Sequence, residues 1–248
     1  MESIEESLGR LARSGNLRVI PSDSSDDGLV DFTSNDYLGL AADRGLQDDF
    51  FRMVADRRPS LTASASRLLA SDQASFSRLE DALGRMYGRK ALLFNSGYHA
   101  NTGLIAALAP AGTLIVADKL VHASIIDGYK LSGADLARFR HNDMAHLESI
   151  IRSKSGRYDR ILVVTESVFS MDGDSPDMNA LVDIRRRYDE VMLYVDEAHG
   201  FAVSGPDGLG LTMALDRPGE VDVIVGTFGK AAASIGAFAV MEESVRSY

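Results

Sequence analysis

Lys230 is the residue of this sequence with the clearest capacity for covalent chemistry. It follows the largely apolar run Val-Asp-Val-Ile-Val-Gly-Thr-Phe-Gly (221–229) and precedes three alanines at 231–233. A charged lysine is costly to bury in such surroundings unless it is paired or neutralised. A lysine that forms a Schiff base loses this charge and becomes a covalent handle, and its small neighbours would let a flat ring approach the backbone. The alternative is an ordinary lysine whose ammonium group extends to solvent.

Asp196 ends a second apolar run, Met-Leu-Tyr-Val-Asp, and His199 follows three residues later. An aspartate at the end of a buried strand needs a cation or a hydrogen-bond donor as its partner. The protonated nitrogen of a pyridine ring is such a partner, and the ring of pyridoxal phosphate (PLP) works as an electron sink only when it can accept charge. Asp196, Glu197 and His199 could instead hold a metal ion. No second His/Asp cluster at a recognisable spacing accompanies them, so no metal is predicted.

Three further positions have both a chemical and a plain structural interpretation. Residues 95–98, Asn-Ser-Gly-Tyr, join a strand to a helix, where Gly97 permits a sharp turn and the helix start offers free N–H groups to a phosphate. His122 could stack on a pyridine ring, or simply open a helix as a polar residue. Thr227, three residues before Lys230, could donate its hydroxyl group to a phosphate, or simply end a strand.

The elements that must position these residues alternate between short apolar runs and helical patterns from about Ala91 onwards. Strands are predicted at 91–94, 114–117, 161–164, 191–195, 223–225 and 237–240, and helices at 101–108, 122–131 and 179–188. Continuous apolar strands separated by helices are typical of a mostly parallel sheet covered on both faces, in an α/β fold. Parallel sheets bind ligands outside the carboxyl ends of their strands. The polar residues that follow the strands are therefore predicted to converge, although strand ends run into polar loops in any protein.

The composition limits the possible binding partners, metal sites and cellular location. The 248 residues are 45% hydrophobic, which is enough for a substantial core. A formal net charge of −10 argues against nucleic acid as the main partner. Because cysteine is absent, disulfides and thiolate metal sites are excluded. The acidic N-terminus does not resemble a secretory signal and no stretch is apolar for long enough to span a bilayer, so we expect a cytoplasmic protein without a membrane partner.

Taken together, these motifs resemble the α-oxoamine synthase family of fold-type I PLP enzymes. The matching segments cover nearly the whole chain in the family's order: 34–40, 94–101, 117–124, 139–143, 165–174, 195–200 and 226–230. The resemblance implies a PLP-binding large domain at 46–240, with a mostly parallel sheet and helices on both faces. An N-terminal helix and arm at 1–45 would precede it. Residues 241–248 would begin the connection to the family's C-terminal small domain, which is absent from this sequence.

Carried over position by position, the resemblance also implies roles. Lys230 would hold PLP covalently, Asp196 would pair with the pyridine nitrogen, and His122 would stack over the ring, which makes these three the predicted catalytic residues. The other cofactor-binding residues would be Gly97, Tyr98, Ser170, His199 and Thr227. Substrate binding is assigned to Arg18, Asn35, His122 and Glu166.

Within the family, residues 64–69 and the Tyr-His-Ala-Asn at 98–101 resemble one branch, that of the biotin pathway. That branch condenses L-alanine with a pimeloyl thioester of coenzyme A or acyl carrier protein, and the resemblance implies a homodimer. The alternatives are a glycine or serine acyltransferase of the same family, and a non-catalytic fragment or interaction subunit. Because the small domain is absent, normal turnover by this chain alone is not expected.

Overall fold

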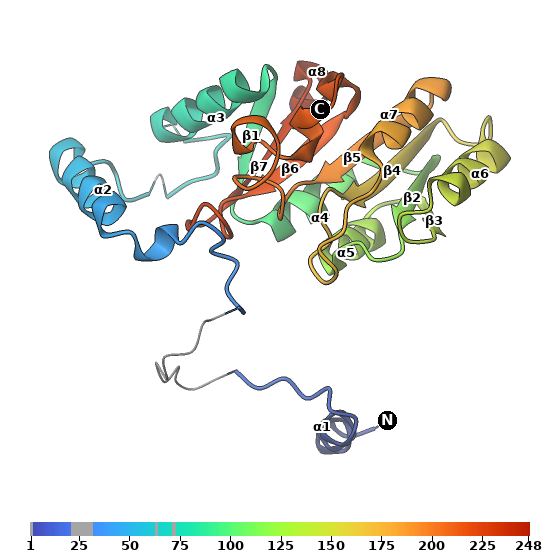
Figure 1. The fold of residues 1–248 in the computed structure, drawn as a ribbon, viewed down its shortest axis with the longest axis horizontal. Coiled ribbons are helices and arrows are strands. Elements are labelled where there is room, and N and C mark those ends of the chain that lie inside the picture. The colour runs from blue at the N-terminus through green and yellow to red at the C-terminus, as the bar shows by residue number, and fades with distance from the viewer. Residues whose placement is uncertain (1, 21–31, 63, 71–72) are drawn as a thin grey trace. The chain divides into compact units, whose positions relative to one another are not determined.

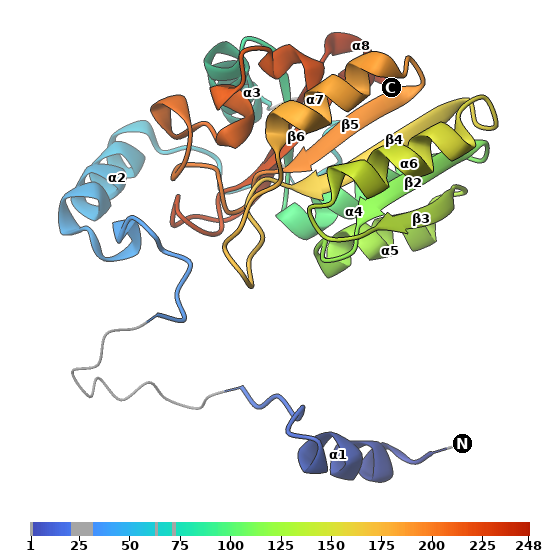
Figure 2. The same ribbon diagram turned by 45° about the vertical axis from the view of Figure 1, so that its right-hand side comes forward.

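The computed structural model describes residues 2–20, 32–62, 64–70 and 73–248, and divides the chain into two units, Met1–Ser34 and Asn35–Tyr248 (Figures 1 and 2). The first unit contains helix α1 (Ile4–Arg13). Its start is held by a capping box, in which Ser3 Oγ accepts from the Glu6 N–H and the Glu6 carboxylate accepts from the Ser3 N–H. The predicted arm at 1–45 includes residues 21–31, which lie outside the described residues, so that boundary stays a prediction.

The second unit is built on one sheet (Figure 1). Within the described residues its seven strands have the order β1-β7-β6-β5-β4-β2-β3. Their bounds are β1 (Lys90–Phe94), β2 (Thr113–Asp118), β3 (Asp135–Phe139), β4 (Arg160–Glu166), β5 (Val191–Asp196), β6 (Val223–Thr227) and β7 (Ala237–Met241). The pairs among β2 to β6 are parallel, which confirms the predicted mostly parallel sheet.

Strand β7 is the exception, because it runs antiparallel to both of its neighbours, β1 and β6. The connection from β6 to β7 is residues 228–236. A parallel return to the same sheet needs a crossover of about a dozen residues or more, usually with a helix, so this short connection forces the chain to reverse. Lys230 lies in this connection.

Helices cover both faces of the sheet (Figure 2). The described helices of the second unit are α2 (Arg44–Arg57), α3 (Ala74–Tyr87), α4 (Gly97–Leu108), α5 (Ala123–Leu131), α6 (Met144–Lys154), α7 (Met178–Arg187) and α8 (Glu243–Ser247), with short 3-10 turns η1 (Leu40–Ala42), η2 (Pro206–Gly208), η3 (Leu211–Ala214) and η4 (Pro218–Glu220). Helices α4 and α5 pack on one face, and α3, α6 and α7 pack on the other. No helix of the described residues is long and apolar enough to cross a membrane.

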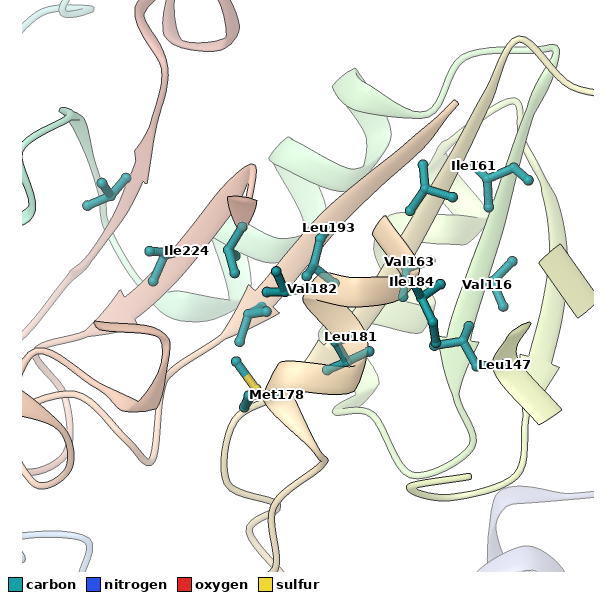
Figure 3. Packing of buried hydrophobic residues seen from close by; sticks show 14 of the residues in the cluster. Val116, Leu147, Ile161, Val163, Met178, Leu181, Val182, Ile184, Leu193 and Ile224 are labelled. Atoms are coloured by element: carbon teal, nitrogen blue, oxygen red, sulfur yellow. The ribbon is translucent and has the colours of Figure 1, made fainter. Parts of the chain in front are cut away.

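The core consists of two layers, one on each face, because successive residues of a strand point to opposite sides. In β4, Ile161 and Val163 belong to the layer under α6 and α7, whereas Leu162 and Val164 belong to the layer under α4 and α5. Figure 3 shows the first layer, with residues of α7 lying over strand residues of β4 and β5. Strands that are buried on both faces explain the continuous apolar runs in the sequence.

Candidate functional site

A pocket of about 170 Å³ collects the chemically capable side chains of the second unit. It is lined by Gly97, Tyr98, Asn101, His122, Ser124, Glu166, Asp196, Ala198, His199, Thr227 and Lys230. Glu166, Asp196 and Thr227 are the last residues of β4, β5 and β6. The other lining residues lie in the segments that follow β1, β2, β5 and β6. Five parallel strand ends therefore supply one pocket, as the position of the polar residues predicts.

Lys230 reaches the pocket from the connection between β6 and β7, and its Nζ lies 2.7 Å from Nε2 of His199. Burial lowers the pKa of Lys230, while Asp196 and Glu166 act in the opposite direction. Burial, followed by the charge of Lys230, lowers the pKa of His199 to about 4. His199 is therefore neutral at neutral pH and its Nε2 can accept from the lysine. A lysine with a lowered pKa is the better nucleophile toward an aldehyde carbon.

Tyr37 contacts His199, and sequence analysis missed this residue. Its hydroxyl lies 2.6 Å from Nδ1 of His199 and donates to Oδ1 of Asn35 at 3.0 Å. The predicted substrate residue Asn35 is therefore not in the pocket lining but is linked to it through Tyr37 and His199. Both residues belong to the segment 34–40 on which the family resemblance partly rests, so a signal for Tyr37 was present.

Asp196 and Glu166 lie side by side at the base of the pocket, because they are paired in the parallel register of β4 and β5. Both are about 5% exposed. Asp196 accepts hydrogen bonds from Nδ2 of Asn101 at 2.7 Å and from the N–H of Ala198 at 2.9 Å. Oε1 of Glu166 accepts from the N–H of His122 at 2.6 Å. Burial, followed by the charge of Asp196, raises the pKa of Glu166 to about 8.

Asn101 is a second residue that sequence analysis missed. Its Nδ2 also donates to Ser124 Oγ at 2.9 Å, and its Oδ1 accepts from the hydroxyl of Tyr194 at 2.7 Å. Ser124 Oγ lies 2.8 Å from Nδ1 of His122, so Asn101 is connected to both predicted catalytic residues of this side, Asp196 and His122. The signal was an asparagine that interrupts the apolar face of α4, where a buried amide needs partners.

The start of α4 and the end of β6 form the opposite side of the pocket. Ser96 caps α4, and Gly97 is its first residue. A Cβ on Gly97 would lie 3.8 Å from the Cβ of Thr227, so the glycine leaves open space beside that threonine. The Thr227 hydroxyl donates to the carbonyl of Gly236 at 3.1 Å and accepts from Gly229 N–H at 3.2 Å. A phosphate contact by Thr227 therefore requires its hydroxyl hydrogen to turn into the pocket. The free N–H groups of the helix start suit an anion.

The remaining predicted residues lie elsewhere in the structure. Ser170 is exposed in the segment after β4 and stands outside the pocket lining. Arg18 belongs to the first unit, which is described by itself, so its role stays a prediction. Glu197, considered with Asp196 and His199 as a metal ligand, is fully buried in the core, where it accepts from Ser167 and Thr212.

His141, two residues after the end of β3, joins the loops that follow β2 and β4 in a separate network. Its Nδ1 lies 2.9 Å from Asp118 Oδ1, and its Nε2 lies 2.9 Å from Asp174 Oδ2. His141, Asp172 and Asp174 place ligand atoms within 4.8 Å of one another, but both ring nitrogens already face carboxylates. Burial lowers the pKa of His141, and the hydrogen bonds with Asp118 and Asp174 outweigh it, so that the net shift is upward.

This shift predicts a pH dependence of stability. The folded pKa of His141 lies above the unfolded value of about 6.5. Its contribution is therefore complete below the unfolded pKa and is lost as the pH rises through the folded pKa. Between about pH 6 and pH 9 we expect the melting temperature of the wild-type chain to fall more steeply than that of His141→Gln. Calorimetry across this range tests it, and two parallel curves would contradict it.

A larger hollow, of about 520 Å³, lies between α3, β1 and α8. Charged residues of both signs line it, among them Glu80, Arg85, Arg89 and Glu242. Arg89 is paired with Glu242 and donates to the carbonyl groups of Val221 and Asp222. These residues serve the packing of the sheet edge, so the smaller pocket is the better candidate for chemistry.

The aminotransferase class I and II family matches residues 27–248 of the sequence. The chain belongs to this family. A Pasteurella multocida protein of the family, named "Putative 8-amino-7-oxononanoate synthase", is 50% identical over 224 residues, which are 90% of this chain and 58% of that protein. The 8-amino-7-oxononanoate synthase of Haemophilus ducreyi is 43% identical over 263 residues, which are 100% of this chain and 68% of that enzyme.

A solved structure of serine palmitoyltransferase from S. paucimobilis, with a bound PLP–myriocin aldimine, matches this aminotransferase-family fold with a TM-score of 0.79. It is 27% identical, and the match covers 98% of this chain and 64% of that one. These similarities confirm the predicted resemblance to α-oxoamine synthases and the predicted fold class. The chain spans little more than half the length of the P. multocida relative.

Proposed function

We propose that this chain binds PLP on Lys230 and serves an 8-amino-7-oxononanoate synthase. In that reaction L-alanine condenses with a pimeloyl thioester and carbon dioxide and the free thiol carrier are released, in biotin biosynthesis. The observation that carries the proposal is the joint presence of Lys230, Asp196 and His199 in one pocket beside the start of α4. The names of the relatives support the choice of substrates.

The pocket residues fit the chemistry of PLP. The cofactor, when bound, supplies a ring that takes up the electrons of a bond broken at the substrate's α-carbon. Lys230 would be the covalent anchor, and its lowered pKa would let a free Nζ take the proton from the substrate's α-carbon. Asp196 holds the charge of the ring nitrogen, and His199 offers Nε2 to the ring hydroxyl. Gly97 and the free N–H groups at the start of α4 hold the phosphate.

The remaining pocket residues hold the ring and the substrate. His122 lines the pocket and is the N-cap of α5, where its side chain accepts from the N–H of Ser124. From this position it would pack over the cofactor ring. Tyr98 stands at the phosphate end and is steadied by Asp127, to which its hydroxyl donates at 2.8 Å. Asn35 and Glu166 would contact substrate, and Ser170 and Thr227 would add cofactor contacts. A homodimer in the cytoplasm, with coenzyme A or acyl carrier protein as the thiol carrier, completes the proposal.

A serine-using acyltransferase is the second candidate. The similarity to serine palmitoyltransferase over 98% of this chain favours it, because the cofactor pocket lies in the shared part. The two candidates differ in the amino acid that enters the pocket. Addition of L-alanine, glycine or L-serine to the PLP-loaded chain, followed by visible absorption, separates them. A spectral change with L-alanine at the lowest concentration supports the first, and a preference for L-serine supports the second.

The proposal is tested by labelling. The chain is mixed with PLP, reduced with borohydride and digested, and the label is located by peptide mass spectrometry. We expect a pyridoxyl group on Lys230, its loss in Lys230→Ala, and its retention in Lys130→Ala, which removes an exposed lysine paired with Asp127. A wild-type chain without label on Lys230 would overturn PLP binding by this chain and favour a non-catalytic fragment or interaction subunit.

A further inference from the structure

Glu166 and Asp196 end adjacent parallel strands and stand opposite each other in the register. Their side chains lie on the same face of the sheet, the face covered by α4 and α5, since Val164 and Tyr194 two residues earlier belong to that layer. Both carboxyl groups are nearly buried. Two carboxylates on neighbouring strand ends in a poorly hydrated site repel each other, so the charge on one disfavours the charge on the other.

The two carboxyl groups receive unequal numbers of hydrogen bonds. Asp196 accepts one on each oxygen, from Ala198 N–H on Oδ1 and from Asn101 Nδ2 on Oδ2. Glu166 accepts one, from the N–H of His122. Hydrogen bonds to an ionised group favour its ionised form. The donor from Asn101 therefore biases the pair toward a charged Asp196.

The amide of Asn101 is held in the orientation that makes this possible. Its Oδ1 accepts from the fully buried hydroxyl of Tyr194, and its second amide hydrogen goes to Ser124. Burial, followed by the charge of Asp196, raises the pKa of Tyr194, which therefore remains a hydrogen-bond donor. Turning the amide over would set two acceptors, Asn101 Oδ1 and Asp196 Oδ2, against each other.

We propose that Asn101, oriented by Tyr194, is a positioning residue that places the negative charge of the carboxyl pair on Asp196 and its proton on Glu166. The inference rests on the proposed function, because there the charge on Asp196 holds the pyridine nitrogen of PLP. The raised pKa of Glu166, about 8, agrees with it. Asn101 thus acts through Asp196 and need not touch the cofactor.

Other titratable groups surround the pair. They are Lys230 after β6, His199 after β5, His122 at the start of α5, Asp118 at the end of β2 and Tyr194 within β5. Lys230 attracts both carboxylates, Asp196 more than Glu166, and so acts in the same direction as Asn101. Asp118 raises the pKa of Glu166 and so acts in the same direction as Asn101. His199 is neutral at this pH. Asn101 donates one amide hydrogen to Asp196 and the other to Ser124, so its hydrogen bond favours the charge on Asp196 alone.

The test is a ¹³C NMR titration of the side-chain carboxyl groups in the cofactor-free chain, assigned with Glu166→Gln and Asp196→Asn. In the wild type we expect Asp196 ionised and Glu166 protonated at neutral pH. In Asn101→Leu the midpoint of Asp196 should rise and that of Glu166 should fall, each by about one pH unit. Tyr194→Phe, which leaves the amide in place, should produce smaller shifts in the same directions.

The matched control is Tyr158→Phe, which removes a hydroxyl that donates to Asp135 at the opposite end of the sheet. It should leave both midpoints unchanged. A wild type in which Glu166 carries the charge, or midpoints that move in neither Asn101→Leu nor Tyr194→Phe, would overturn the inference. Because the cofactor is absent from this titration, failure of PLP to label Lys230 would refute the proposed function without affecting the result.

A second readout separates charge placement from mere packing. Asn101→Leu should weaken PLP binding about tenfold, as expected for one charged hydrogen bond. Adding Glu166→Gln to this variant removes the competing acid and forces the charge back onto Asp196, so affinity should recover. A purely structural defect of Asn101→Leu would persist in the double variant, and such persistence would contradict the inference.

Discussion

Asp196→Asn is expected to weaken PLP binding by about a hundredfold or more. Asp196 is about 5% exposed, and its carboxylate is held by Asn101 and Ala198 in the pocket. Removing one partner of a buried charged pair costs roughly 3–5 kcal/mol, and 3 kcal/mol corresponds to about a hundredfold in the dissociation constant. Asparagine also cannot hold a proton on the ring nitrogen by its charge. An absorbance titration with PLP measures the effect.

The matched control is Asp135→Asn, which makes the same substitution at an exposed residue that accepts from Tyr158. It should bind PLP as the wild type does. Asp196→Asn should also lower the midpoint of Glu166, because the charge that helps to raise its pKa is gone. Wild-type affinity for PLP in Asp196→Asn would show that Asp196 does not pair with the ring.

Glu197→Ala is expected to lower the free energy of unfolding by about 3 kcal/mol, because it leaves buried donors unpaired and opens a cavity. Glu197 is fully buried, and its carboxylate accepts from Ser167 Oγ and from both the N–H and the hydroxyl of Thr212, the latter two at 2.7 Å. Gly200 and Gly210 surround it so closely that a Cβ on either would overlap the carboxyl group. Urea unfolding followed by circular dichroism measures the loss.

Glu197→Gln provides the control, because an amide fits the same space. Its Oε1 can still accept from Thr212, and its NH₂ can donate to Ser167 once the serine hydroxyl turns away. The expected loss is about 1 kcal/mol. Burial raises the pKa of Glu197 against the hydrogen bonds of Ser167 and Thr212, so the neutral amide also avoids a buried charge. Equal losses for both variants would contradict this account.

The sequence predicted the buried part of the fold better than its edges. Strands β2, β4, β5 and β6 are covered on both faces, so their residues form continuous apolar runs that stand out by composition. Strand β3 (Asp-Leu-Ala-Arg-Phe) lies at the edge of the sheet, where partial exposure mixes polar and apolar residues, and it was not predicted. The antiparallel direction of β7 was also not predicted, because an apolar run carries no sign of its direction.

The candidate site shows the same division. Polar residues at strand ends, such as Asp196 and Lys230, could be picked out because the apolar runs before them mark their places. Tyr37 and Asn101 were missed in spite of the signals named above, since their contacts join segments that are far apart in the chain: Tyr37 with His199, and Asn101 with Asp196. Glu197 adjoins Asp196 in sequence but points to the other face of the sheet, where Ser167 and Thr212 bind it.

The place of β7 has a consequence for the order in which the molecule can assemble. Among the described residues β1 pairs with β7 and with no other strand, and β7 comes after the other strands of this sheet in the chain. During synthesis β2 to β6 can therefore pair while β1 still lacks a strand partner. β1, whose chain continues into Gly97, joins the sheet through β7, which lies between β1 and β6. The edge of the sheet that leads into Gly97 is therefore completed only after β7 has been made.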